Sequence, residues 1–219
     1  MEAATSGSFP ALLSVNVGRP RTIEWRGRQV TTAIWMEPLE GSVRIEGENL
    51  VGDEQADRRV HGGADKAVYA YAAEDYDWWS TSTGPLTPGT FGENLTTTGI
   101  DLSACQIGDR WYVGSAVLEV AQPRSPCFKL GIRIDDETFP ERFAAAQRPG
   151  VYLRIIVPGA VTQGDAILVS PTEPPAVTIG SLVDDDVSEH VLRAAAADAR
   201  VPHGWRRAAT RSLLRTPEP

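Results

Sequence analysis

Short apolar runs bounded by glycine and proline recur along most of the chain, and this pattern predicts β-strands. The runs that are rich in β-branched and aromatic residues occupy positions 11–18, 31–40, 67–72, 106–113, 116–121 and 151–170. Gly-Ser at 114–115 and Pro-Gly at 158–159 separate neighbouring runs in the manner of turns. Short strands at this spacing predict an all-β barrel.

Two short helices are expected in the connections between strands. Residues 73–80 have acidic side chains in the first turn, where the helix dipole favours negative charge. A second helix is expected at 139–147, closed by a Pro-Gly pair. Between them, the Pro-, Gly- and Thr-rich segment 84–99 predicts a long loop, and loops of this length are usually functional or disordered.

The composition changes at the proline-rich segment 171–175, which predicts a domain boundary there. Beyond it, residues 189–200 are rich in alanine, and Trp205, Ala209 and Leu213 share one face of a predicted helix. We therefore expect three parts: a disordered N-terminus at 1–10, a mainly β barrel with a few short helices at 11–172, and a small C-terminal helical bundle at 177–215.

The composition also excludes several classes of protein. A chain of 219 residues buries roughly 70% of its unfolded surface, so it needs no disulfides to be stable. Its two cysteines cannot form a disulfide framework and favour a reducing cytoplasm. No run approaches the ~20 apolar residues of a membrane span, and the N-terminus lacks the features of a signal peptide. The net charge of -8 argues against a nucleic-acid polymer as partner, although the arginine-rich tail at 193–215 is locally basic.

The first segment that contains candidate functional residues is 52–66. It holds one histidine, four carboxylates, a glycine pair and one of only two lysines. The candidate residues among them are His61, Asp53, Glu54, Gly62, Gly63 and Lys66. Consecutive glycines let backbone N–H groups approach an anion closely. The alternative interpretation is a tight turn before a strand, with His61 hydrogen-bonded locally.

The second segment is 91–95, which lies within the predicted long loop. Glu93 and Asn94 supply a carboxylate and a carboxamide, which together can recognise the donor and acceptor edge of a heterocycle. The alternative interpretation is an Asx-type turn with no ligand.

The third segment is 122–129, in which two prolines stiffen the backbone on both sides of Arg124 and hold Cys127 in a defined place. If Arg124 and Lys129 are also close to the thiol in space, they favour the thiolate, the form that ligates metals. The alternative is an inert buried cysteine, which is the interpretation we favour for Cys105.

Several common sites are not supported by the sequence. The three histidines and two cysteines lack zinc-ligand spacing, and no GxGxxG, Walker or GxSxG motif is present. A single thiolate ligand would suit a soft metal carried by an organic cofactor that supplies the other sulfurs.

Taken together, the runs GDEQADRRVHGGADKAVYAY, FGENLTTTG, QIGDRWYVG and VAQPRSPCFKL resemble the MOSC domain family, named after the C-terminal domain of molybdenum cofactor sulfurase. The resemblance covers residues 11–170. Within the family, the sequence resembles the YiiM group in particular, which is linked to resistance to 6-N-hydroxylaminopurine and carries a small C-terminal three-helix domain. It implies a β-barrel that binds the molybdenum cofactor, a pterin dithiolene with molybdenum and a phosphate. The family's metal-binding thiolate maps onto Cys127.

The resemblance also implies an activity, since relatives include enzymes that reduce N-hydroxylated compounds to amines. The expected function is reduction of N-hydroxylated bases, with electrons from a separate reductase because the chain has no flavin or nicotinamide fingerprint. Expected catalytic residues are Cys127, His61, Asp53 and Glu54. Expected cofactor-binding residues are Arg124, Lys129, Asn94, Glu93, Gly62, Gly63, Lys66 and Ser125.

Two other functions stay open. Cys127 could carry a persulfide for sulfur delivery, although the chain has no fused lysine-aldimine desulfurase region, or the protein could hold the cofactor without turnover. The oligomeric state is also open. Exposure of Trp78, Trp79 and Trp111 would favour an interface such as that of a homodimer.

Overall fold

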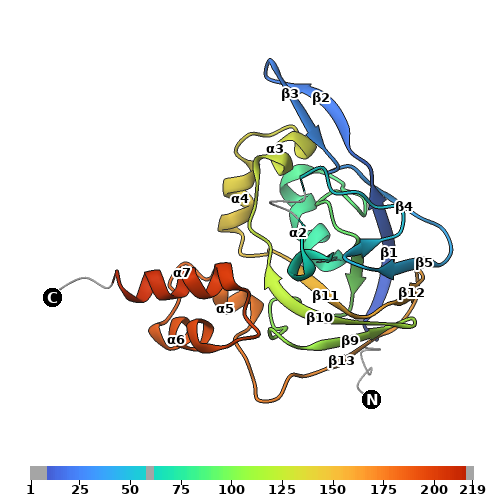
Figure 1. The fold of residues 1–219 in the computed structure, drawn as a ribbon. Helices are drawn as coiled ribbons and strands as arrows, with labels where there is room; N and C mark the ends of the chain where they lie inside the picture. The colour runs from blue at the N-terminus through green and yellow to red at the C-terminus, as the bar shows by residue number, and fades with distance from the viewer. Residues whose placement is uncertain (1–8, 58–61, 216–219) are drawn as a thin grey trace, which may run out of the picture.

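An eight-stranded sheet forms the body of the protein in a computed structural model that describes residues 9–57 and 62–215 (Figure 1). Its strands are β1 (Ala11–Gly18), β4 (Met36–Pro38), β7 (Val68–Ala72), β8 (Leu95–Thr98), β9 (Arg110–Val113), β10 (Ala116–Pro123), β11 (Val151–Val157) and β13 (Ile167–Ser170). Across the sheet the order is β13-β9-β10-β11-β7-β8-β1-β4. The neighbours β7 and β8 are parallel, and the other pairs are antiparallel.

Two smaller sheets complete the strands. The first has the order β12-β5-β6, with β5 (Val43–Glu46), β6 (Asn49–Leu50) and β12 (Gly159–Val161). The second is a hairpin of β2 (Arg21–Trp25) and β3 (Arg28–Thr32), which extends away from the large sheet (Figure 1). Its two turn residues, Arg26 and Gly27, both have positive φ (52° and 70°), as a two-residue turn of type I′ requires.

Seven helical segments occupy the connections and the C-terminal part of the described chain. They are η1 (Ala64–Lys66), α2 (Ala73–Thr83), α3 (Phe128–Ile134), α4 (Phe139–Ala145), α5 (Ile179–Val183), α6 (Glu189–Ala197) and α7 (His203–Leu213). The helices expected at 73–80 and 139–147 are found as α2 and α4, whereas α3 was not predicted. None of the described helices is long and apolar enough to cross a membrane.

The expectation of a mainly β fold is confirmed, with 32% strand against 26% helix, but the described residues do not form a closed barrel. The large sheet ends at β4 and β13, and the start of β1 meets the start of β13 through one isolated bridge between Ala11 and Ala166. The sheet does not close because β1 pairs along its length with β8 and β4 instead. Helices α5, α6 and α7 follow the last strand, where helices were expected. Of the segment predicted to be disordered, residues 1–8 lie outside the described residues.

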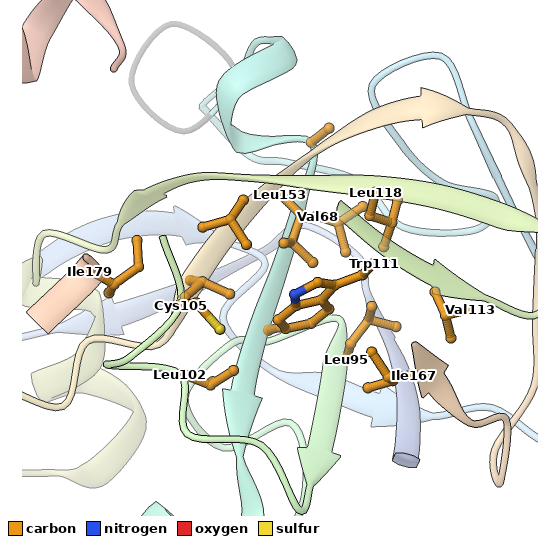
Figure 2. Packing of buried hydrophobic residues seen from close by; sticks show 14 of the residues in the cluster. Val68, Leu95, Leu102, Cys105, Trp111, Val113, Leu118, Leu153, Ile167 and Ile179 are labelled. Atoms are coloured by element: carbon orange, nitrogen blue, oxygen red, sulfur yellow. The ribbon is translucent and has the colours of Figure 1, made fainter. Parts of the chain in front are cut away.

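The main apolar core lies on the inner face of the large sheet and centres on Trp111 (Figure 2). Trp111, Val68 and Leu118 are each 0% exposed. Cys105 belongs to this core, and burial raises the pKa of its thiol to about 12. Ile179 from α5 packs into the same cluster, so the last part of the chain shares the core of the sheet.

A second cluster consists almost entirely of aromatic rings. It joins β7, α2 and α4 through Tyr69, Tyr71, Tyr76, Trp79, Phe91, Phe139 and Phe143. The Trp79 Nε1–H donates to the Tyr71 hydroxyl at 2.8 Å. Since Trp79 and Trp111 are buried and only Trp78 is exposed, the three tryptophans do not form an exposed cluster that would favour an interface.

We expect Trp111→Ala to lower the free energy of unfolding by about 3–5 kcal/mol, because it leaves a large cavity in the main core. Tyr112→Ala is the matched control, since the neighbouring side chain is 46% exposed and its loss should cost about 1 kcal/mol or less. Urea denaturation of both variants measures the difference. Equal losses for the two substitutions would contradict the placement of Trp111 at the centre of the core.

Candidate functional site

A cleft of about 600 Å³, including the open space at its mouth, lies beside Cys127. The segment that connects β3 to β4 forms one wall, and the 53–56 loop, η1, β7, the 92–94 loop, the start of α3 and β11 form the rest. The lining residues are Thr32, Ala33, Ile34, Met36, Asp53, Glu54, Gln55, Ala56, Lys66, Tyr69, Gly92, Asn94, Arg124, Cys127, Lys129 and Tyr152.

The cleft brings together seven of the residues that the sequence predicts for the site. They are Asp53, Glu54, Lys66, Asn94, Arg124, Cys127 and Lys129. Gly62, Gly63 and Glu93 do not line it, and Ser125 lines a separate groove toward α4 and Trp205. His61 lies outside the described residues.

The position of Cys127 follows from the end of β10 and the start of α3. The strand ends at Pro123, and α3 begins at Phe128, so Cys127 is the extended residue just before the helix (φ −136°, ψ 161°). Its carbonyl accepts from the Leu130 N–H at 3.0 Å, which anchors the first turn. The thiol is partly exposed and faces the cleft, whereas Cys105 is buried in the core.

Arg124 is buried in the wall of the cleft, with 6% of its surface exposed. Its Nη1–H donates to the Phe91 carbonyl, and its guanidinium carbon lies 4.8 Å from the centre of the Tyr69 ring, in cation–π range. Among the described residues, no carboxylate forms an ion pair with it. A buried charge without a counter-charge is costly, so the cleft favours an anion at this position.

Glu93 is fully buried and braces the loop that leads to Phe91 and Gly92. Its Oε1 accepts from the Gly89 N–H at 2.7 Å and from the Thr96 hydroxyl at 2.8 Å. The Tyr76 hydroxyl donates to the same oxygen. Burial raises the pKa of Glu93, although these hydrogen bonds oppose the shift. Its carboxyl group therefore holds the loop from inside the protein.

Asn94 lies at the edge of the cleft, and most of its amide is used within the protein. The Oδ1 atom accepts from the Tyr69 N–H at 3.1 Å, and the Nδ2–H₂ donates to the Asn16 carbonyl at 3.4 Å. These bonds tie the loop before β8 to β7 and β1. Asn94 nevertheless contributes to the cleft wall.

Asp53 is the carboxyl group that the structure holds most firmly in the cleft. Its Oδ1 accepts from the Gly18 N–H at 2.7 Å. Glycine is required at position 18, because a Cβ there would lie 2.6 Å from the Ala33 carbonyl oxygen. Burial raises the pKa of Asp53, against hydrogen bonds from Gly18 and Asn94, so this carboxyl group keeps its proton to a higher pH. The neighbouring Glu54 is exposed.

Sequence reasoning missed two tyrosines of the cleft, Tyr69 and Tyr152. They are paired across β7 and β11, with ring centres 5.0 Å apart. Tyr69 lies in a continuous apolar run, and an uninterrupted run does not show which face of a strand meets a cleft. The cleft wall at 32–34 was missed for a related reason, since it comes from a connection remote in sequence.

The comparisons with known proteins place this geometry in one family. The MOSC domain profile matches residues 57–168. YflK of Bacillus subtilis (strain 168) is 38% identical over 155 residues, 70% of each chain. YiiM of Escherichia coli (strain K12) is 33% identical over 176 residues, covering 75% of this chain and 78% of that protein. The chain therefore belongs to the MOSC domain family.

Within that family the fold is similar to that of the YiiM proteins. The crystal structure of YiiM from Geobacillus stearothermophilus matches with a TM-score of 0.76 at 27% identity, over 93% of this chain and 99% of that chain. A protein of Gibberella moniliformis (strain M3125 / FGSC 7600) named "Reductase" is 34% identical over 172 residues. That match covers 76% of this chain but only 30% of the fungal protein.

The residues of the cleft fit the molybdenum cofactor with which MOSC domains are associated. Cys127 provides one soft sulfur donor, and Arg124 provides a buried positive charge beside it. A cofactor that brings its own sulfur ligands and a phosphate needs one further thiolate and nearby cations from the protein. Lys66 and Lys129, which also line the cleft, add to that positive charge.

The raised pKa of Asp53 predicts a pH-dependent effect of Asp53→Asn on stability. Below about pH 3.9, the ordinary pKa of an aspartate, both side chains are neutral and the two proteins should be similar. As the pH rises through the folded-state pKa, the wild type must ionise a buried carboxyl group and loses stability relative to the variant. The asparagine of the variant keeps an oxygen that accepts from the Gly18 N–H.

Thermal unfolding of wild type and Asp53→Asn across this pH range measures the effect as a difference in Tm that grows with pH. Glu54→Gln is the control for removing one negative charge from the same loop, since the Glu54 side chain is exposed. A difference in Tm that stays constant with pH would contradict a raised pKa for Asp53.

Proposed function

We propose that this protein is an oxidoreductase that binds the molybdenum cofactor in the Cys127 cleft and reduces N-hydroxylated bases to the corresponding amines. The reaction is R–NHOH + 2e⁻ + 2H⁺ → R–NH₂ + H₂O. The single observation that carries the proposal is Arg124, a buried guanidinium without a carboxylate partner among the described residues, in the same cleft as the Cys127 thiol.

The charge of the cleft explains how an acidic protein can bind an anionic cofactor. The chain carries a net charge of -8, yet Arg124, Lys66 and Lys129 converge on this cleft. Positive charge beside a thiol also lowers the cost of forming the thiolate. The same arrangement therefore binds an anion and prepares Cys127 to act as a metal ligand.

When bound, the cofactor would supply the redox chemistry, which passes two electrons from the donor to the N–O bond of the substrate. The chain's own residues bind it, orient the substrate and provide protons. Asp53 is suited to the last task because burial raises its pKa, so it keeps a proton to a higher pH than an ordinary aspartate does. Glu54 is a second carboxyl group at the mouth of the cleft.

The electrons are expected from a separate reductase. The fungal relative named "Reductase" supports an oxidoreductase role, and 70% of that protein lies outside its match to this chain. We propose a small N-hydroxylated substrate and a protein electron donor as partners, and neither a nucleic-acid polymer nor a membrane. A cytoplasmic location remains a prediction from the cysteine content.

Cys127→Ser is the direct test of the proposal. We expect protein from a molybdenum-cofactor-competent host to lose its bound molybdenum and its reduction of 6-N-hydroxylaminopurine, because an alcohol does not replace a thiolate ligand. Cys105→Ala is the matched control, since it removes a thiol from the core and not from the cleft. Elemental analysis and an assay with a chemical electron donor give the two readouts.

Three outcomes would contradict the proposal. Full molybdenum content and activity in Cys127→Ser would exclude Cys127 as the metal ligand. A wild-type protein without molybdenum but with a 32 Da adduct on Cys127 would indicate a persulfide carrier. Bound molybdenum with no turnover would indicate a cofactor carrier instead of an enzyme.

A further inference from the structure

The Tyr152 hydroxyl is a polar group of the cleft that neither the described fold nor the proposed cofactor site uses. Tyr152 lies on β11 directly opposite Tyr69 on β7, and both rings line the cleft. The Tyr69 hydroxyl donates to the Pro149 carbonyl at 2.7 Å, so it is committed to the fold. The Tyr152 hydroxyl has no hydrogen-bond partner within residues 9–57 and 62–215, although its ring is partly buried.

The position of this hydroxyl relates it to the reacting end of the cleft. Arg124 and Cys127 line this cleft together with Tyr152. A tyrosine hydroxyl has an ordinary pKa of about 10, so at neutral pH it is protonated and acts as a hydrogen-bond donor. The cations of the cleft are suited to bind an anionic group. A neutral donor beside a guanidinium and a thiol is suited instead to bind an uncharged oxygen.

We propose that the Tyr152 hydroxyl recognises the N-hydroxyl oxygen of the substrate and holds it at the Cys127 end of the cleft. This inference rests on the proposed function. During the reaction the N–O bond breaks, two electrons and two protons are consumed, and the oxygen leaves as water. Tyr152 keeps its own proton throughout, and its role is to bind and align the oxygen that is lost.

The same contact gives the site a way to distinguish substrate from product. The amine product lacks the oxygen that Tyr152 binds, so only the substrate gains this hydrogen bond. Loss of the bond when the oxygen departs favours release of the amine. Tyr152 is thus a specificity-determining residue for N-hydroxylated compounds.

Tyr152→Phe in the molybdenum-loaded protein tests the inference, because it removes one oxygen atom and keeps the ring. With no electron donor present, the Kd of 6-N-hydroxylaminopurine and of adenine can be measured by calorimetry without turnover. We expect the affinity for the N-hydroxylated base to fall about tenfold, as for loss of one hydrogen bond, with the affinity for adenine unchanged. Molybdenum content should also be unchanged.

Tyr112→Phe is the control, since this tyrosine is exposed on β9 and does not line the cleft. It should leave both affinities as in the wild type. Unchanged binding in Tyr152→Phe, or equal weakening for both bases, would overturn the inference. Loss of molybdenum in this variant would overturn it too, by assigning Tyr152 to the cofactor. A wild-type protein that binds neither molybdenum nor the N-hydroxylated base would instead overturn the proposed function, and this inference with it.

Discussion

The burial of the Arg124 guanidinium is the constraint on which the site depends. Its hydrogen bond to the Phe91 carbonyl and its position over the Tyr69 ring fix one wall of the cleft. They leave a positive charge with no carboxylate partner in the described part of the chain, beside the Cys127 thiol. Burying such a charge is costly for the free protein, and binding an anion lowers that cost. We infer that the buried charge lowers the folding stability of the free protein and favours ligand binding.

The residues around Arg124 are held in place by groups that do not line the cleft. Glu93 braces the loop that presents the Phe91 carbonyl, with Gly89, Thr96 and Tyr76 donating to its Oε1. The aromatic cluster beneath packs Phe91 against β7, α2 and α4. A cleft wall built on this rigid base keeps the thiol and the guanidinium in fixed relation, which a preorganised site requires.

How much the sequence predicts differs between the fold and the site. Runs of strand-forming residues and helix-start signals predict the β-rich body, α2 and α4, because these features are local. The absence of a closed barrel depends on how β1 divides its pairing between distant strands, which local patterns do not encode. The sequence pattern does not predict the short helix α3, because its first turn follows two prolines.

For the site, the clustered motifs predict seven residues that the structure brings into one cleft. Glu93 shows the limit of this reasoning, since a carboxylate on a glycine-bearing loop reads equally well as a ligand contact or as an internal brace. Tyr69 and Tyr152 show another limit, because only the fold reveals which faces of β7 and β11 meet the cleft.

The molybdenum content of an Arg124→Gln variant tests the central claim most directly. Glutamine can still donate a hydrogen bond to the Phe91 carbonyl but carries no charge. We expect a folded protein with an unaltered Cys127 and little or no bound molybdenum. Molybdenum bound at the wild-type level in this variant would contradict it.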